Sequence, residues 1–343
     1  MRVLLVMGLL IGQVFSQSLS QRLAAPVFYE LNVQPGYQSN PLNLSDVELE
    51  KAARDTSYLN GIAFSSSNVI TVTAKLAYAP RIFSGRKTSM NASVNYHYYH
   101  DIQERSYQTY SFSLRQSLGK YRYLDLGYWI LPEYYLRNYL TVNPQTLISN
   151  REVCNFGTDR FWLGFEHRLS KKNRIEYRLT VRNEIYQAPF SHYNLNMLEG
   201  DLKFGVDQFK SIKMNAEIQY GLADNRNDYD DKDRSYKYLN LRPSMTAKVL
   251  GKHRIRVGAR YEQRAYNSEH ADDPLHAGRY QKEYRLDVTL LPRMNGPISV
   301  EPFAGYRERN VDSDVPAVRD LKSFNRYWFG IRFGFKSVID MYF

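Results

Sequence analysis

The sequence predicts an all-β fold, a transmembrane antiparallel up-and-down β-barrel of about 14 strands. Two observations lead to this fold class. About 14 segments alternate apolar and polar residues with a period of two, which is the side-chain period of a β-strand. Short and long connections alternate strictly between these segments, as in barrels whose loops differ in length at the two ends.

The final segment, SFNRYWFGIRFGFKSVIDMYF, shows the alternation most clearly. Its odd-numbered positions from Tyr327 to Phe343 are mostly apolar or aromatic, and its charges occupy even-numbered positions. Since successive side chains of a strand point to opposite faces, one face is apolar and the other is mixed. The same pattern recurs in residues 27–33, 70–78, 87–100, 110–114, 124–130, 161–165, 173–184, 198–206, 214–222, 239–249, 253–264, 284–290 and 298–306.

The connections carry further expectations. Short basic turns such as SGRK and SKKN alternate with long polar segments such as ADNRNDYDDKDRS. In the first long connection, SDVELEKAARD forms either a helix of one or two turns or an irregular loop. The long connection around Cys154 is expected to fold inward and narrow the barrel. A single cysteine forms no internal disulfide.

The N-terminus predicts export. Arg2 precedes an apolar run from Val3 to Ile11, and Val14 and Ser16 stand at cleavage-site spacing. We therefore expect a signal peptide over residues 1–16, a short periplasmic extension over 17–26 and the barrel over 27–343. After the signal, no apolar stretch reaches the roughly 18 residues that a membrane helix needs.

The pattern favours a membrane barrel over a soluble sandwich. In a sandwich the polar face meets bulk water, and charges of either sign scatter over it. Here the polar face stacks arginine and glutamate along single strands. About 14 strands would also exceed the usual size of one open sheet, whereas a closed barrel has no edges. Tyrosines at strand ends on the apolar face predict an aromatic girdle, namely Tyr78, Tyr98, Tyr220, Tyr261 and Tyr306.

The last residues resemble the insertion signal of bacterial outer-membrane β-barrels, with apolar or aromatic side chains at Phe333, Phe335, Ile339, Met341 and Phe343. In addition, GYQSNP (36–41) resembles the GYDSN-type element of surface-lipoprotein-assembly-modifier barrels, here without the helical-repeat domain. The resemblance implies a porin-like barrel in the outer membrane of a Gram-negative cell. It also implies contact with lipid, lipopolysaccharide and the barrel-insertion machinery.

The strand positions whose side chains are expected to face inward carry most of the charge, in a chain of formal net charge +11. The candidate pore-lining residues are Arg174, Arg178, Arg182, Arg254, Arg256, Arg260, Arg264, Arg332, Glu176 and Glu262. One interpretation is a water-filled pore whose positive field favours anions. The other is that arginine and glutamate pair across neighbouring strands and narrow or plug the lumen.

Two function hypotheses follow. The first is a passive or weakly anion-selective channel for small polar or anionic solutes. The alternative is a non-enzymatic assembly, secretion or surface-scaffold barrel that docks another protein, with the outer loops as a possible contact. Nucleic acid is not an expected partner, because the basic residues are spread at period two and form no single patch.

Enzymatic and metal chemistry are not expected, and no cofactor is implied. His167 with Ser170 is the one hint of a hydrolase, and His167 is more simply an interfacial residue beside a turn. The spacing in the acidic connection does not match a calcium-binding loop, which favours a solvated or lipopolysaccharide-bridging loop over a calcium site. Its carboxylates are Asp224, Asp228, Asp230, Asp231 and Asp233.

Overall fold

The computed structural model describes residues 22–55, 65–142, 149–209, 211–226, 233–249, 251–269 and 273–339. Within them the chain forms a closed antiparallel barrel of 14 strands, which confirms the predicted fold class. Each strand pairs with its neighbours in the chain, and β1 pairs with β14 to close the ring. Closure gives every strand two partners, so no sheet edge is exposed to lipid.

The strands are 12 to 21 residues long. They are β1 Val27–Gln38, β2 Ser67–Tyr78, β3 Thr88–Tyr99, β4 Tyr107–Gly119, β5 Arg122–Val142, β6 Ser149–Arg168, β7 Asn173–Tyr186, β8 Leu195–Phe209, β9 Ile212–Asn225, β10 Tyr236–Val249, β11 His253–Tyr266, β12 Tyr280–Leu291, β13 Ile298–Asp312 and β14 Phe324–Ile339. Each predicted segment overlaps one of these strands. The strands exceed the roughly ten residues needed to cross a bilayer, so they extend beyond it.

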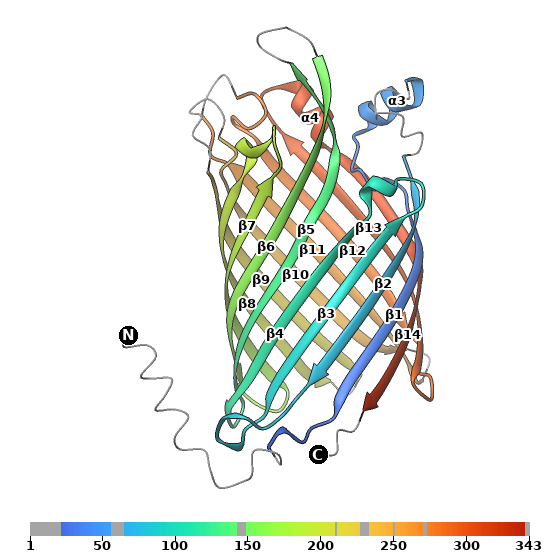
Figure 1. The fold of residues 1–343 in the computed structure, drawn as a ribbon, viewed down its shortest axis with the longest axis vertical. Helices are drawn as coiled ribbons and strands as arrows, with labels where there is room; N and C mark the ends of the chain where they lie inside the picture. The colour runs from blue at the N-terminus through green and yellow to red at the C-terminus, as the bar shows by residue number, and fades with distance from the viewer. Residues whose placement is uncertain are drawn as a thin grey trace, which may run out of the picture.

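The two ends of the barrel differ, as the connection lengths predict. Figure 1 shows tight turns at the lower end and longer connections at the upper end. β1 begins and β14 ends at the lower end, so the lower end corresponds to the expected periplasmic side. No helix among the described segments is long and apolar enough to cross a membrane.

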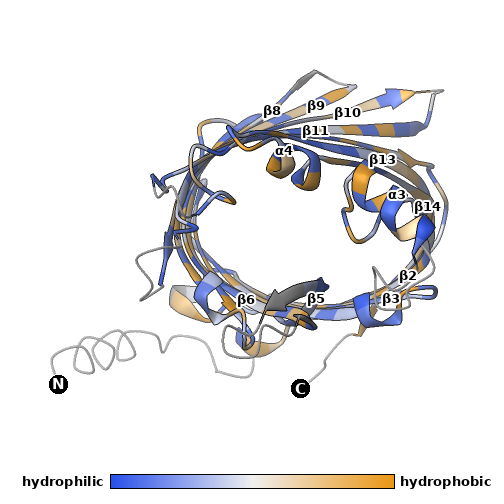
Figure 2. Ribbon diagram, turned by 90° about the horizontal axis from the view of Figure 1, so that it is seen from above, coloured by the Kyte–Doolittle hydropathy of each residue, from blue (hydrophilic) through white to orange (hydrophobic). Residues whose placement is uncertain are grey.

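The two faces of the wall follow the predicted parity. Large apolar side chains stand exposed on one face, for example Tyr177, Leu179 and Val181 on β7. On the other face, side chains from strands that are not neighbours meet. Arg115 on β4 lies 3.3 Å from Glu166 on β6 across β5. Only a concave face brings such strands together, so the polar face lines the lumen, and Figure 2 shows the alternation as colour bands along the strands.

Two helices stand at the upper end, α3 (Asp46–Arg54) and α4 (Pro316–Lys322). The first settles the open question about SDVELEKAARD in favour of a helix. Ser45 caps it, accepting from the N–H of Glu48, while the Glu48 carboxylate accepts from the N–H of Ser45. The second helix was not predicted, although Pro316 at its start is a favourable first helical residue. Short 3₁₀ turns occupy Phe83–Gly85, Gln103–Arg105 and Ser191–Tyr193.

The expectation for the connection around Cys154 is wrong. β5 continues to Val142 and β6 starts at Ser149, so Cys154 lies inside a strand. Its side chain is buried and packs with Tyr186 and Phe190. The upper parts of β5 and β6 project beyond the rest of the wall in Figure 1. There the outward face need not be apolar, so the alternation that reveals a membrane strand is lost.

The GYQSNP element spans the end of β1 and the residues after it. Asn40 is buried and donates to the carbonyl oxygens of Leu44 (2.7 Å) and Asn325 (3.1 Å). Its own side-chain oxygen accepts from the N–H of Leu44 at 2.8 Å. One amide thereby fastens the segment leading to α3 to the first residues of β14.

The terminal strand also follows the prediction where the structure describes it. Phe333, Phe335 and Ile339 project from the outer face of β14 and are exposed. Met341 and Phe343 lie outside the described residues, as do residues 1–21 with the predicted signal peptide.

Candidate functional site

The candidate site is the lumen wall, to which the period-two pattern assigns the ten candidate residues. They come from three strands. β7 carries Arg174, Glu176, Arg178 and Arg182, β11 carries Arg254, Arg256, Arg260, Glu262 and Arg264, and β14 carries Arg332. The pattern makes this assignment from the position of each residue along its own strand.

Most of these charges are paired. Arg178 lies 2.6 Å from Glu176, and Arg182 lies 3.2 Å from Glu199 on β8. Both Arg260 and Arg264 contact Glu262, whose side chain is almost fully buried. Arg332 lies 3.0 Å from Glu301. Two of these ion pairs, Arg182 with Glu199 and Arg332 with Glu301, join neighbouring strands as the second interpretation of the lumen expects, and the other three lie within one strand.

Three of the predicted residues differ from this pattern. Within the described residues Arg174, Arg254 and Arg256 form no ion pair, and each side chain is exposed to the lumen. Arg174 donates one hydrogen bond, 2.9 Å long, to the side-chain oxygen of Asn215 on β9. All three residues lie toward the lower ends of their strands, so unpaired positive charge gathers in that half of the barrel.

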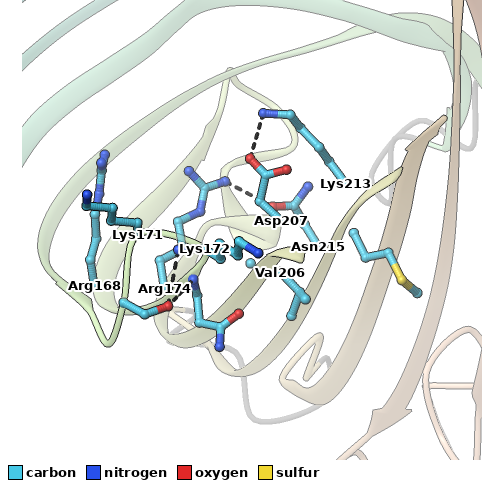
Figure 3. A pocket seen from close by; sticks show the side chains of 12 residues that line it. Arg168, Lys171, Lys172, Arg174, Val206, Asp207, Lys213 and Asn215 are labelled. Carbon is cyan, nitrogen blue, oxygen red and sulfur yellow. Dashed lines mark hydrogen bonds and ion pairs between the residues drawn. The ribbon is translucent and has the colours of Figure 1, made fainter. Parts of the chain in front are cut away.

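Three cavities in this half of the wall are lined by an excess of basic residues. The first, of about 240 Å³, surrounds the β6–β7 turn and is shown in Figure 3. Its charged lining is Arg168, Lys171, Lys172, Arg174, Lys213 and the single carboxylate Asp207. The second, of about 420 Å³, adjoins it at Arg174 and Asn215. The third, of about 630 Å³, has the charged lining Lys248, Lys252, Arg254, Arg293, Lys336 and the single carboxylate Glu301.

The upper half of the lumen is more densely packed. Tyr236 and Tyr238 on β10 are buried with Leu195 and Met197 on β8. Arg234, from the connection before β10, reaches Glu184 on β7 at 3.4 Å and places its guanidinium 4.9 Å from the centre of the Tyr186 ring. Sequence analysis missed Arg234, because connections lack the periodicity that assigns a residue to a face.

A buried histidine–carboxylate pair at the upper end also comes from a connection, the one between β11 and β12. His276 lies 2.9 Å from the carboxylate of Asp273, and both side chains are buried. Burial lowers the pKa of His276 to about 4, although Asp273 opposes the shift. The imidazole is consequently neutral at pH 7.

Helices α3 and α4 lie within the outline of the barrel when it is viewed from above (Figure 2). Glu48 on α3 forms an ion pair with Arg137 on β5, and Arg137 also donates to the carbonyl of Asn43. Since the segment before α3 is anchored to β14 and α3 is anchored to β5, this segment crosses part of the mouth. The chain thus narrows its mouth with residues 40–54 and with α4.

The two weaker hints in the sequence concern Ser170 and the acidic connection. Ser170 accepts hydrogen bonds from the N–H groups of Lys172 and Asn173, each 3.1 Å, which is a turn interaction. Asp228, Asp230 and Asp231 lie outside the described residues. In the part of the chain that is described, histidine, cysteine and carboxylate side chains form no group of three or more that could hold a metal ion.

No protein-family model matches the sequence, and no curated protein is significantly similar to it. Solved structures of outer-membrane barrels do share its fold. The outer-membrane channel DcaP of Acinetobacter baumannii superposes with a TM-score of 0.52 at 10% identity, over 91% of this chain and 97% of that one.

Two further solved structures superpose on this chain with lower TM-scores. The anion-selective porin from Comamonas acidovorans gives a TM-score of 0.42 at 9% identity, over 92% and 99% of the two chains. OmpT, an outer-membrane protein of Vibrio cholerae, gives 0.46 at 8% identity, over 94% and 100%. At such identities the likeness extends to the fold alone. That fold, a closed barrel of antiparallel strands with an apolar outer face, is the one of bacterial outer-membrane porins and channels.

Proposed function

We propose that the protein is a non-enzymatic outer-membrane channel, passive or weakly anion-selective, for small polar solutes. The observation that carries the proposal is the cation excess of the three cavities in the periplasmic half of the lumen. The first and third each have five basic side chains against one carboxylate. Positive rings in a low-dielectric wall concentrate anions and exclude cations. The fold shared with the DcaP channel agrees with this proposal.

The location and partners belong to the same proposal. We expect export with cleavage after residue 16, insertion by the barrel-insertion machinery and a final place in the outer membrane. Tyr261 and Tyr284 pack together on the outer face near the upper end, with ring centres 5.3 Å apart. Exposed Lys237 and Lys282 lie just above that level. This belt suits contact with the sugars and phosphates of lipopolysaccharide.

A planar-bilayer measurement tests the channel. With a salt gradient, the reversal potential of the wild-type protein should indicate a modest preference for chloride. In the double variant Arg256→Glu with Arg260→Glu, two charges change sign and the net charge of the lumen falls by four units, so the preference should shift toward the cation. Lys237→Glu on the outer face is the matched control and should leave the reversal potential unchanged.

The alternative function has a specific observation in its favour, namely the narrowed mouth with its paired charges. A barrel that docks another protein needs no open path. If purified, folded protein passes no current at any voltage, the channel proposal is refuted and the docking role is favoured. An unchanged ion preference in the double variant would refute only the selectivity.

A further inference from the structure

Four arginines stand in one row across four neighbouring strands. Arg260 on β11 is the register partner of Arg285 on β12, Arg285 is the partner of Arg307 on β13, and Arg307 is the partner of Arg326 on β14. We call these four residues the arginine row. Neighbouring strands lie about 4.8 Å apart, so the row spans about 14 Å. Like charges directly opposite each other destabilise a sheet, and here three successive pairs repeat that arrangement.

The carboxylates near the row do not neutralise it. Asp287 binds Arg285 at 2.7 Å. Glu262 is shared between Arg260 and Arg264, and Glu283 is shared between Arg307 (2.7 Å) and Arg309 (3.0 Å). Arg326 has no ion pair with any described residue. Six guanidinium groups therefore share three carboxylates, which leaves a surplus of three positive charges.

The row also has donors without acceptors. The Nε atoms of Arg260, Arg307 and Arg326 are buried and have no hydrogen-bond partner within the described part of the chain. A buried donor without an acceptor is costly, and proteins normally pair such groups. The surplus charge and the unpaired donors belong to the same side chains. An oxyanion is the kind of ligand that suits such side chains, because it supplies negative charge and several acceptor oxygens to the guanidinium groups.

Trp328 holds two members of the row in place. Its ring centre lies 4.9 Å from the guanidinium carbon of Arg285 and 5.4 Å from that of Arg326. The ring itself packs over Gly305 on β13. Guanidinium groups stack on aromatic faces and keep their N–H edges available for other contacts. The tryptophan therefore preorganises the row and stands within contact distance of whatever binds there.

We propose that the arginine row is a binding site for small oxyanions that carry two or more negative charges on phosphate or carboxylate groups. Planar guanidinium forks match both groups, and four of them along about 14 Å suit an anion with more than one charged end. Arg260 is in the middle of β11, and Arg326 is two residues from the upper end of β14, so the row runs toward the upper end of the barrel. The site deepens the proposed channel function by giving it a saturable step for one class of solute.

Calorimetric titration of the full chain in detergent tests the site. At constant ionic strength, pyrophosphate and succinate are the probes and chloride is the monovalent comparison. We expect saturable binding of at least one probe, at least about tenfold tighter than chloride. Binding by pyrophosphate alone or by succinate alone identifies the preferred group. Binding by neither probe, or equal binding of chloride, would overturn the proposal.

Variants locate the site. Arg307→Gln with Arg326→Gln should weaken probe binding by at least about tenfold, the usual effect of losing charge-assisted hydrogen bonds. Arg254→Gln with Arg256→Gln removes the same charge from the lumen outside the row and should weaken binding by less than about threefold. Equal losses in the two double variants would mean a general basic lumen, and the proposal would be wrong. Heat-dependent gel mobility establishes that each variant is folded.

A readout from wild-type protein keeps the test independent of variant folding. Probe binding should change the fluorescence of Trp328 saturably, and Trp328→Phe should remove most of that change while calorimetry still detects binding. If the fluorescence change persists in Trp328→Phe, the anion binds elsewhere. A chain that binds the probe without passing current refutes only the channel. A chain that conducts without saturable binding refutes only this site.

Discussion

At the scale of single residues, side-chain size on the lumen face controls where the large polar groups lie. The Trp328 ring occupies the space over Gly305, where a Cβ atom would lie 2.3 Å from the nearest ring atoms. The glycine therefore leaves the space that the indole occupies, and the indole in turn contacts Arg285 and Arg326. On the outer face Gly200 has the opposite surroundings, since a Cβ atom there would meet nothing within 4 Å.

These two glycines make a matched prediction. Gly305→Ala should displace Trp328, lower the free energy of unfolding by about 1 to 3 kcal/mol and shift the tryptophan emission. Gly200→Ala should change the free energy of unfolding by no more than about 0.5 kcal/mol. Urea unfolding in detergent, followed by fluorescence, measures both. Equal effects of the two substitutions would show that Trp328 does not depend on Gly305.

At the scale of elements, the two helices bind to the mouth in different ways. α3 is held by Glu48, which both completes the capping box with Ser45 and pairs with Arg137 on β5. α4 ends at Lys322, whose ammonium lies 5.7 Å from the centre of the Tyr139 ring on β5. Burial, together with the nearby Arg137 and Arg279, lowers the pKa of Lys322 to about 7.

Substitutions separate the capping of α3 from its attachment. Ser45→Ala removes one capping bond and should cost about 1 kcal/mol of helix stability. Glu48→Gln keeps an acceptor for the cap but removes the negative charge of the buried ion pair with Arg137, which should cost about 3 kcal/mol. Hydrogen exchange of the amides in residues 46–54 reports both effects. Faster exchange in Ser45→Ala than in Glu48→Gln would contradict the role given to the ion pair.

The attachment of α4 should depend on pH. The pKa of Lys322 is lower in the folded protein than its ordinary value, so between pH 7 and about 10 the unfolded state binds more protons than the folded state. Stability of the docked helix therefore increases as the pH rises above 7, and the penalty is fully present below it. His276, with a pKa of about 4, does not titrate in this window.

Amide exchange of α4, corrected for the intrinsic effect of pH, measures this dependence. Protection should rise between pH 7 and 9, by up to about tenfold per pH unit. Lys322→Met should give a protection that is flat over the same range. Protection that falls with pH in the wild type, or an unchanged slope in Lys322→Met, would exclude Lys322 as the titrating group.

At the scale of the whole molecule, one alternating pattern separates two solvents. Along each strand, side chains point alternately outward to lipid and inward to the aqueous lumen, so two residues an odd number of positions apart meet different solvents. β3 offers a clean pair, because Val94 is exposed on the outer face and Asn91 is exposed on the inner face. Asn91 donates only a weak hydrogen bond, 3.4 Å long, to Ser113.

The same change on the two faces should have unequal costs. Val94→Arg places a charge among lipid chains and should lower the free energy of folding into bilayers by about 2 to 4 kcal/mol. Asn91→Arg enters the aqueous lumen and should change it by less than about 1 kcal/mol. Urea titration of folding into lipid vesicles compares them. A larger cost for Asn91→Arg would reverse the assignment of the two faces.

The sequence by itself determined the architecture, because a period of two along each strand is a local property. It predicted a closed antiparallel barrel of about 14 strands and assigned the candidate pore-lining residues to one face, and it left open whether SDVELEKAARD forms a helix or a loop. It did not predict α4, the strand that contains Cys154 or the contacts of Arg234, all of which lie at the upper end of the barrel, where the alternation of apolar and polar residues is lost. Only the tertiary structure decided which charges meet. Register between strands depends on how the whole barrel closes, so the row that joins Arg260 to Arg326 and the ion pairs around it cannot be found from one strand at a time.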